Sequence, residues 1–302
     1  MNEADGRIAA LAEQQFGVFS RKQAAAEGLS EEAMSRRVMT KRWAEMFPAV
    51  YRLPGATRTG RQRAMAAVLW GGSESAISHT TAARLLRLDA VRTDELHLTL
   101  PSNFGRRSRG FVVHRMAALP PSDLVAVDGI RCTSATRTII DCAALLDDEG
   151  IEHAFEQARR MGLTSPATLA RRFEELGGKG RPGSSRVRRL VGVQTPEMRP
   201  LESRLEVKLA RLLRASSLPK PERQHRVGRY RLDFAWPNRG LGCECDGFEH
   251  HGARLAWKRD RGRLAEIEAA GWRIVHVTWD DVTHRPDQTI ARIALALGEL
   301  AA

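Results

Sequence analysis

The spacing of hydrophobic and polar positions changes several times along the chain. Residues 3–15 and 31–43 have the period of amphipathic helices, and Ser20 and Ser30 stand where N-caps are expected. The extended segment FPAVYRLPG follows. Three short helices with a basic last one, followed by a hairpin, predict a winged helix-turn-helix domain over residues 1–55. A small helical bundle with a solvated basic face is the alternative interpretation.

Residues 56–195 mix both periods. RQRAMAAVLWGG and SHTTAARLL predict helices, whereas DELHLTLP and GFVVHRM alternate apolar and polar residues as strands do. This region is expected to end in a basic linker around GGKGRPGSSRVRRL. Its histidines, His79, His97, His114 and His153, lie on different elements without the spacing of a metal site, so we interpret them as surface or core residues.

Residues 196–302 begin with the amphipathic helix PLESRLEVKLARLLRA, in which Glu202 and Glu206 share a face. YRLDFAW and LGCECDG alternate as strands around the turn PNRG. If Trp236 pairs with Leu241, the antiparallel register sets Asp233 opposite Glu244, with Asp246 on the same face.

Three converging carboxylates need a compensating cation, because like charges opposed across a ladder are destabilising. We therefore expect a site for Mg²⁺ or Mn²⁺ formed by Asp233, Glu244 and Asp246. Two alternatives stay open. One is a solvated hairpin surface, and the other is a zinc site made by Cys243, Cys245, His250 and His251.

The amino-acid composition limits the kinds of partner that the protein is expected to bind. The 302 residues carry 48 Lys and Arg against 36 Asp and Glu, a net charge of +12, which favours a polyanion such as nucleic acid. No apolar run is long enough to span a membrane, and the start lacks the pattern of a signal peptide, so we expect a soluble, cytoplasmic protein. Residues 156–231 hold nineteen Lys and Arg against seven Asp and Glu, which predicts a positive funnel beside the acidic hairpin, unless these side chains merely solvate helices.

The C-terminal region resembles a known family through PLESRLE, YRLDFAWP, ECDGFEHH, KRDRGRL and EAAGWRIVHVTWDDV, in this order. Over residues 198–300 it is similar to the endonuclease-like domain related to very-short-patch-repair endonucleases, within the PD-(D/E)XK superfamily. The resemblance implies a restriction-endonuclease-like α/β domain with a central mixed sheet and metal-dependent cleavage of DNA phosphodiester bonds.

The same resemblance implies residue roles. Asp233 and Glu244 would bind the metal ion, and Glu206, or Glu202, would be the helix carboxylate. His250 would act as a general acid or base. Asp246 stands where the superfamily usually has lysine, so that Lys258, Arg259 or His250 must replace its charge, unless the site is inactive.

The first 190 residues resemble another family through GVFSRKQAAAEGLS, VYRLPG, SHTTAARLLRL, VDGIRCTSATRTIIDCA and EHAFEQARRMGLTS. They are similar to AbiEi-type antitoxins of type IV abortive-infection systems. This implies an operator-binding winged helix and a middle domain that opposes a nucleotidyltransferase toxin. The R-T-x-x-D stretch, Arg137, Thr138 and Asp141, fits a helix cap and an internal salt bridge better than a site.

Together these observations predict an α+β multidomain chain. Its parts are a winged helix over 1–55, an antitoxin-like middle domain over 56–195 and an endonuclease-like domain over 196–302. Two functions compete: a metal-dependent DNA endonuclease, and a non-catalytic DNA-binding regulator with a degenerate nuclease domain. Both use basic residues of the third helix to contact DNA phosphates, namely Arg36, Arg37, Lys41 and Arg42. No membrane partner is expected, and the oligomeric state stays open.

Overall fold

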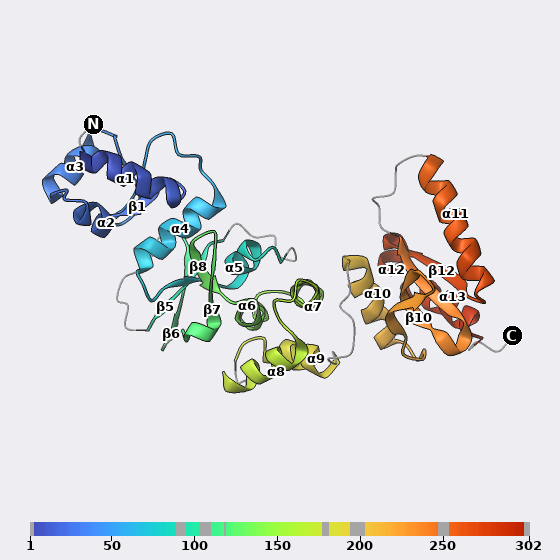
Figure 1. Cartoon of the computed structure of the whole chain (residues 1–302). Helices are drawn as coiled ribbons and strands as arrows, with labels where there is room; N and C mark the ends of the chain where they lie inside the picture. The colour runs from blue at the N-terminus through green and yellow to red at the C-terminus, as the bar shows by residue number, and fades with distance from the viewer. Residues whose placement is uncertain are drawn as a thin grey trace. The chain divides into compact units, whose positions relative to one another are not determined.

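The computed structural model has an α+β architecture built on three sheets, and it confirms the predicted fold class. Two compact units are formed, one by Met1–Leu146 with Thr168–Val187 and the other by Asp147–Ala167 with Arg188–Ala302 (Figure 1). The division at residues 55 and 195 stays a prediction. The structure describes residues 3–88, 95–102, 110–117, 119–176, 181–193, 203–246 and 254–298.

The first unit begins with the predicted winged helix. Ser20 and Gln23 form a capping box at α2, and the Ser30 side chain caps α3. The strands form a small antiparallel sheet in the order β1-β3-β2. The elements are α1 (Glu3–Gln14), β1 (Val18–Ser20), α2 (Arg21–Ala26), α3 (Glu31–Met39), β2 (Ala44–Phe47) and β3 (Val50–Arg52).

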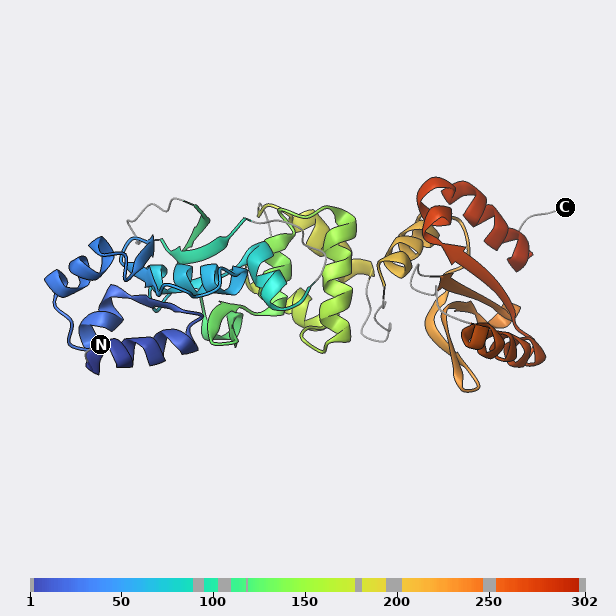
Figure 2. The ribbon, with the colours of Figure 1, turned by 90° about the horizontal axis from the view of Figure 1, so that it is seen from above.

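A five-stranded mixed sheet, in the order β6-β5-β4-β8-β7, follows in the same unit. Helix α4 lies between this sheet and the winged helix (Figures 1 and 2), and its Met65 and Trp70 share one core cluster with Val18 and Leu98. The elements are α4 (Gly60–Gly71), β4 (Ala76–Ile77), α5 (His79–Leu85), β5 (His97–Pro101), β6 (Val112–Met116), the 3₁₀ turn η1 (Pro121–Asp123), β7 (Leu124–Val127), β8 (Ile130–Thr133) and α6 (Ala135–Cys142). Helices α8 (Pro166–Glu175) and α9 (Ser184–Val193) come later in the chain.

The second unit contains a four-stranded sheet in the order β12-β11-β10-β9, in which only β11 and β12 are parallel. One core cluster joins β10, β11 and β12 to α10, α12 and α13, and a second joins Leu232 and Ala235 to Ile267 of α11. The elements are α7 (Asp148–Arg160), α10 (Arg204–Ala215), β9 (Glu222–Val227), β10 (Tyr230–Trp236), the 3₁₀ turn η2 (Pro237–Arg239), β11 (Leu241–Asp246), α11 (Arg254–Ala269), β12 (Arg273–Thr278), α12 (Trp279–His284) and α13 (Pro286–Leu297).

Gly240 closes the hairpin between β10 and β11. Its φ of +53° lies in the left-handed region, and a Cβ there would come within 2.7 Å of the Gly271 carbonyl oxygen. The Gly240 carbonyl accepts a hydrogen bond from the Arg273 amide at 2.8 Å, which ties the hairpin to the start of β12. Glycine therefore fixes the turn that sets the register of the two acidic strands.

A buried network of charges holds the first unit together, as the R-T-x-x-D stretch predicts. Arg137 is 2 % exposed and pairs with Asp123 at 2.7 Å and with Asp141 at 3.0 Å. Arg172 also reaches Asp123, at 2.7 Å, and Arg181 reaches Asp141, at 2.8 Å. Burial raises the pKa of Asp141, while the two guanidinium groups oppose that shift. The network is structural because each buried carboxylate is shared by two arginines.

We expect Arg137→Ala to lower the free energy of unfolding by roughly 3–5 kcal/mol, because it leaves two buried carboxylates short of a partner. Urea unfolding followed by circular dichroism measures this change. Arg61→Ala is the matched control, since the Arg61–Asp128 pair is exposed by 47 % and 51 % and its loss should change the free energy by under about 1 kcal/mol. Equal changes for the two variants would contradict the structural role of Arg137.

Candidate functional site

The register of β10 and β11 places the predicted acidic residues together. Trp236 pairs with Leu241, as predicted, and the ladder ends with Phe234 opposite Cys243, the pair next to Asp233 and Glu244. In β9, the pairs on either side set Gln224 opposite Asp233. In β12, His276 pairs with Glu244. Gln224, Asp233, Glu244 and His276 thus form a row across all four strands, which we call the polar row.

One end of the polar row is linked to helix α10. Glu206, 4 % exposed, accepts a hydrogen bond at 2.7 Å from the buried Gln224 side-chain amide, which also donates to Asp233 at 3.4 Å. The second carboxylate oxygen of Asp233 accepts from the Cys245 backbone amide at 2.8 Å. Ser203 caps α10 and so fixes the helix turn that carries Glu206. The Gln224 amide thus orients both carboxylates, and the Cys245 amide holds Asp233 from a second side.

Glu244 is buried and contacts helix α11. It is 6 % exposed, and it accepts a hydrogen bond from Arg263 of α11. Burial raises the pKa of Glu244, and the nearby Asp233 acts in the same direction, whereas Arg263 and His276 lower that pKa. A cation near Glu244 is therefore electrostatically favoured.

Asp246 ends strand β11 and is exposed. It lies 3.2 Å from the His276 ring nitrogen. In the described part of the chain, the oxygens of Asp233, Glu244 and Asp246 do not all lie within 4.8 Å of one another. The three carboxylates therefore do not converge as expected, and Asp246 contacts His276 instead.

Several predicted residues fall outside this description. His250 and Glu202 lie outside the described residues, as do the side chains of Lys258 and Arg259, which belong to helix α11. For the alternative zinc site, Cys243 lies in the hydrophobic core, where burial raises the pKa of its thiol. Sequence reasoning missed Gln224 and His276, whose positions depend on strand pairings that no local pattern predicts, and Arg263, which contacts Glu244 from helix α11.

The predicted DNA contacts lie on helix α3 and just after it, because α3 ends at Met39, before Lys41 and Arg42. Arg36 and Lys41 are exposed, and Arg42 has a side chain that is 58 % exposed. Arg37, expected on the same surface, is instead only 11 % exposed. Its guanidinium pairs with Asp5 at 2.9 Å and lies 5.5 Å from the centre of the Trp43 ring. Arg37 therefore fastens α3 to α1, because the helix turns its side chain inward.

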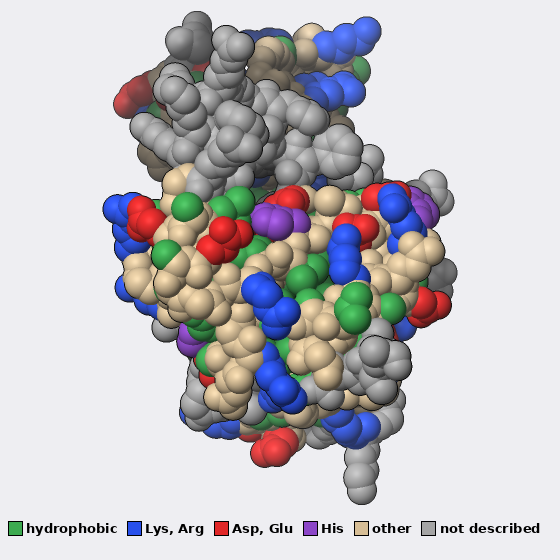
Figure 3. Space-filling model, turned by 90° about the vertical axis from the view of Figure 1, so that its right-hand side faces the viewer, with side chains coloured by type: hydrophobic (Ala, Val, Ile, Leu, Met, Phe, Trp, Pro, Cys, Tyr) green, Lys and Arg blue, Asp and Glu red, His purple; other side chains and the backbone are tan. Residues whose placement is uncertain are grey.

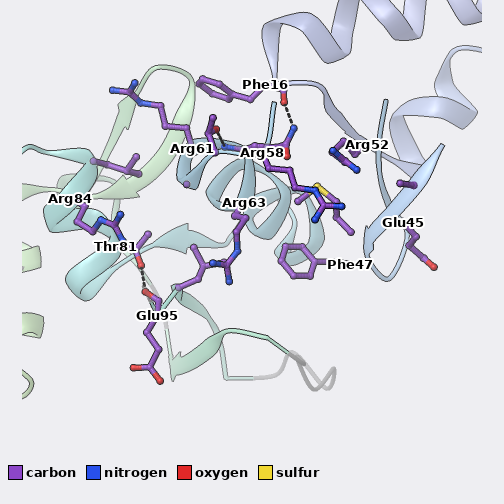
Figure 4. A pocket seen from close by; sticks show the side chains of 17 residues that line it. Phe16, Glu45, Phe47, Arg52, Arg58, Arg61, Arg63, Thr81, Arg84 and Glu95 are labelled. Atoms are coloured by element: carbon purple, nitrogen blue, oxygen red, sulfur yellow. Dashed lines mark hydrogen bonds between the residues drawn. The ribbon is translucent and has the colours of Figure 1, made fainter. Parts of the chain in front are cut away.

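A pocket of about 920 Å³ opens between the wing strands, α4 and α5 (Figure 4). Its lining includes Glu45 and Glu95 as well as five arginines, which sequence reasoning did not group. Guanidinium groups bind phosphates in a planar, two-pronged geometry, so this lining suits a nucleic-acid backbone. The arginines are Arg52, Arg58, Arg61, Arg63 and Arg84.

Much of the positive charge predicted for residues 156–231 is engaged by acidic residues. Besides Arg172 and Arg181, Arg214 pairs with Glu152 and Arg223 with Glu156, at 2.8 Å and 3.0 Å. On the face shown in Figure 3, Lys and Arg side chains are interspersed with Asp and Glu over the described surface. The funnel is therefore weaker than the sequence count suggests.

Comparison with known proteins agrees with this geometry. Residues 7–54 match the family model of the transcriptional regulator AbiEi antitoxin, AbiEi_4, and residues 206–297 match REase_MTES_1575, a restriction-endonuclease-like family. The chain joins an AbiEi-like segment to a restriction-endonuclease-like domain. The endonuclease-like match begins at Glu206 and contains the whole polar row.

Two relatives from Mycobacterium tuberculosis extend the similarity of this AbiEi-like and endonuclease-like chain. They are the uncharacterized protein MT2308 of strain CDC 1551 / Oshkosh and the uncharacterized protein Rv2248 of strain ATCC 25618 / H37Rv. Each is 28 % identical over 219 residues, which cover 71 % of this chain and 78 % of the relative. Among the described residues, no helix has the length and apolar character needed to cross a membrane.

We expect Arg37→Ala to destabilise the winged helix by about 1–3 kcal/mol, because it removes a shielded hydrogen bond to a charged group. Arg36→Ala should leave stability unchanged within about 0.5 kcal/mol, since its side chain is exposed. Thermal unfolding of both variants measures the difference. An Arg37→Ala protein as stable as Arg36→Ala would contradict the role of Arg37 in joining α3 to α1.

Proposed function

We propose that this chain is a DNA-binding regulator whose C-terminal domain hydrolyses DNA phosphodiester bonds with the help of Mg²⁺ or Mn²⁺. The observation that carries the proposal is that Asp233 and Glu244 lie next to the paired Phe234 and Cys243 of adjacent strands, near enough for Asp233 to raise the pKa of Glu244. It lies inside the segment that matches a restriction-endonuclease-like family. The very-short-patch-repair subclass, cleavage itself and a cytoplasmic location are all part of the proposal.

The donor set suits a hard divalent cation. Asp233, Glu244 and Glu206 offer carboxylate oxygens, which Mg²⁺ and Mn²⁺ prefer over nitrogen or sulfur. Their oxygens do not all lie within 4.8 Å of one another in this structure, so binding an ion would require the side chains to draw together. When bound, such an ion supplies Lewis-acid polarisation of the scissile phosphate and of an attacking water. Gln224 keeps Asp233 and Glu206 oriented through its side-chain amide.

Two further side chains complete the proposed chemistry. Arg263 brings positive charge to Glu244, and we assign to it the stabilisation of negative charge on the phosphate that lysine gives in the superfamily. His276, which belongs to the polar row and contacts Asp246, can take up or release a proton there. The departure at Asp246 is thus compensated by residues from α11 and β12.

A second function is supported by the N-terminal match. The AbiEi family implies DNA binding and a toxin partner in general. In this version the winged helix binds an operator, a nucleotidyltransferase-type toxin is the partner, and the nuclease-like domain serves only as a binding surface. Asp246 in place of lysine favours this version, whereas the polar row favours cleavage.

We expect the full chain to nick supercoiled plasmid DNA with Mg²⁺ or Mn²⁺, and Asp233→Ala or Glu244→Ala to reduce the rate on the order of 10²-fold or more. Arg263→Ala should also lower the rate, with partial recovery in Arg263→Lys, because the charge returns without the guanidinium geometry. Agarose-gel assays of nicking rates measure all four.

Glu266→Ala and Arg229→Ala are matched controls, because these residues form an exposed ion pair on the same domain. Both should nick at the parental rate. Rates that are equal in the parent, Asp233→Ala and Glu244→Ala, or no nicking with either ion, would leave only the regulator.

We expect Arg36→Ala with Lys41→Ala to weaken DNA binding and to lower the slope of log K against log salt by about 2, because each lost phosphate contact removes about 0.9 from that slope. Fluorescence anisotropy with a labelled duplex at several salt concentrations measures the slope. An unchanged slope would rule out α3 as the DNA-contacting helix.

A further inference from the structure

Three histidines from separate elements meet in the first unit. His79 is the first residue of α5, His97 begins β5, and His114 lies in β6. Their ligand nitrogens all lie within 4.8 Å of one another, the only such group of His, Cys, Asp and Glu among the described residues. We call these residues the histidine cluster.

The rings are in direct contact. His97 Nδ1 lies 2.9 Å from His114 Nε2, and the His79 and His114 rings stack with centroids 3.5 Å apart. His97 and His114 are brought together by the parallel pairing of β5 with β6, in which Thr99 opposes His114. This closeness requires neutral rings, because three imidazolium ions could not be crowded in this way.

The surroundings keep the rings neutral. Burial lowers the pKa of His79 to about 2 and that of His114 to about 4, and it also lowers the pKa of His97. The nearby Arg137 and Arg181 act in the same direction on His79. A neutral imidazole keeps one nitrogen lone pair, which is the form that binds transition metals.

The outward ring nitrogens of His79 and His97 have polar partners, as in histidine-bound metal centres. Ser78 Oγ lies 2.9 Å from His79 Nδ1 and accepts a hydrogen bond from the Thr99 hydroxyl at 2.8 Å. The Glu95 carboxylate lies 3.7 Å from His97 Nε2. These partners leave His79 Nε2 and His97 Nδ1 to face the centre of the cluster.

His79 also has a strained backbone. Its φ of +50° lies in the left-handed region, which is unfavourable by about 1–3 kcal/mol for residues other than glycine. Such strain persists where the surroundings require it, and it often marks a functional position. Here it starts helix α5 with the imidazole against His114.

We propose that the histidine cluster binds one transition-metal ion of the zinc class through His79 Nε2, His97 Nδ1 and His114 Nε2. Three ligands leave a fourth position for water or for a ligand atom. The nitrogens of such a centre lie about 3.3 Å apart, given metal–nitrogen distances of about 2.0–2.1 Å. The stacked His79 and His114 rings must therefore tilt apart until the lone pairs in their ring planes meet at one ion. Imidazole ligands favour Zn²⁺, Co²⁺, Ni²⁺ or Cu²⁺ over Mg²⁺, which separates this site from the acidic one.

The test uses the full chain carrying Asp233→Ala and Glu244→Ala, so that the acidic site does not contribute. Metal-free protein is titrated with Co²⁺ and Zn²⁺ by calorimetry, and the visible spectrum of the Co²⁺ form is recorded. We expect one equivalent to bind, with the intense absorption of a four- or five-coordinate cobalt centre. Absence of binding, or a weak six-coordinate spectrum, would overturn the proposal.

Two variants assign the ligands. His114→Phe keeps the ring stack without its nitrogens, and His79→Asn tolerates the left-handed backbone. Each should weaken metal binding at least tenfold. Metal should raise the melting temperature of the parent but not that of either variant. His225→Phe, in the second unit, is the control and should bind as the parent does. Parental affinity in both cluster variants would overturn the assignment, and the parental cobalt spectrum tests the site even if a variant fails to fold.

Discussion

The main constraint on the second unit is the repulsion between the Asp233 and Glu244 carboxylates, which lie on neighbouring strands of its core sheet. Phe234 and Trp236 of β10 and Leu241 and Cys243 of β11 are buried in one core cluster. A register shift of one residue would take these apolar side chains out of the core, so the core fixes the pairs that adjoin Asp233 and Glu244. The like charges are therefore built into the fold and must be offset by other groups.

The chain offsets buried charge in two different ways. In the first unit, Asp123 and Asp141 are each shared by two arginines, so the charges balance within the protein. Glu206 and Asp233 receive amide donors, and Glu244 receives Arg263. At Glu206 and Asp233, neutral amide donors thus orient carboxylates of the type that binds a hard divalent ion.

Sequence patterns predicted the features that depend on residues close together in the chain. The capping residues Ser20 and Ser30, the β10–β11 register and the salt bridge of Arg137 with Asp141 could all be predicted from neighbouring residues. The winged helix followed from the order of its elements. Such features depend on spacings within one helix or one hairpin, where sequence and geometry are tightly linked.

Pairings between distant segments could not be predicted in the same way. Gln224 and His276 join the polar row only through the order of four strands. The histidine cluster depends on a parallel β5–β6 pair and on helix α5, so the separate histidines carry no shared spacing. Arg37 turned inward because Asp5, in another helix, offers it a shielded partner.

The histidine cluster and the arginine-lined pocket share structural elements. The Thr81 hydroxyl accepts a hydrogen bond from the His97 amide at 2.9 Å and donates to the Glu95 carbonyl at 3.1 Å (Figure 4). Both Thr81 and Glu95 line the pocket, which also contains residues of the wing. Because Thr81 bonds both to the His97 amide and to the Glu95 carbonyl, one backbone segment positions a histidine of the cluster and part of the pocket wall.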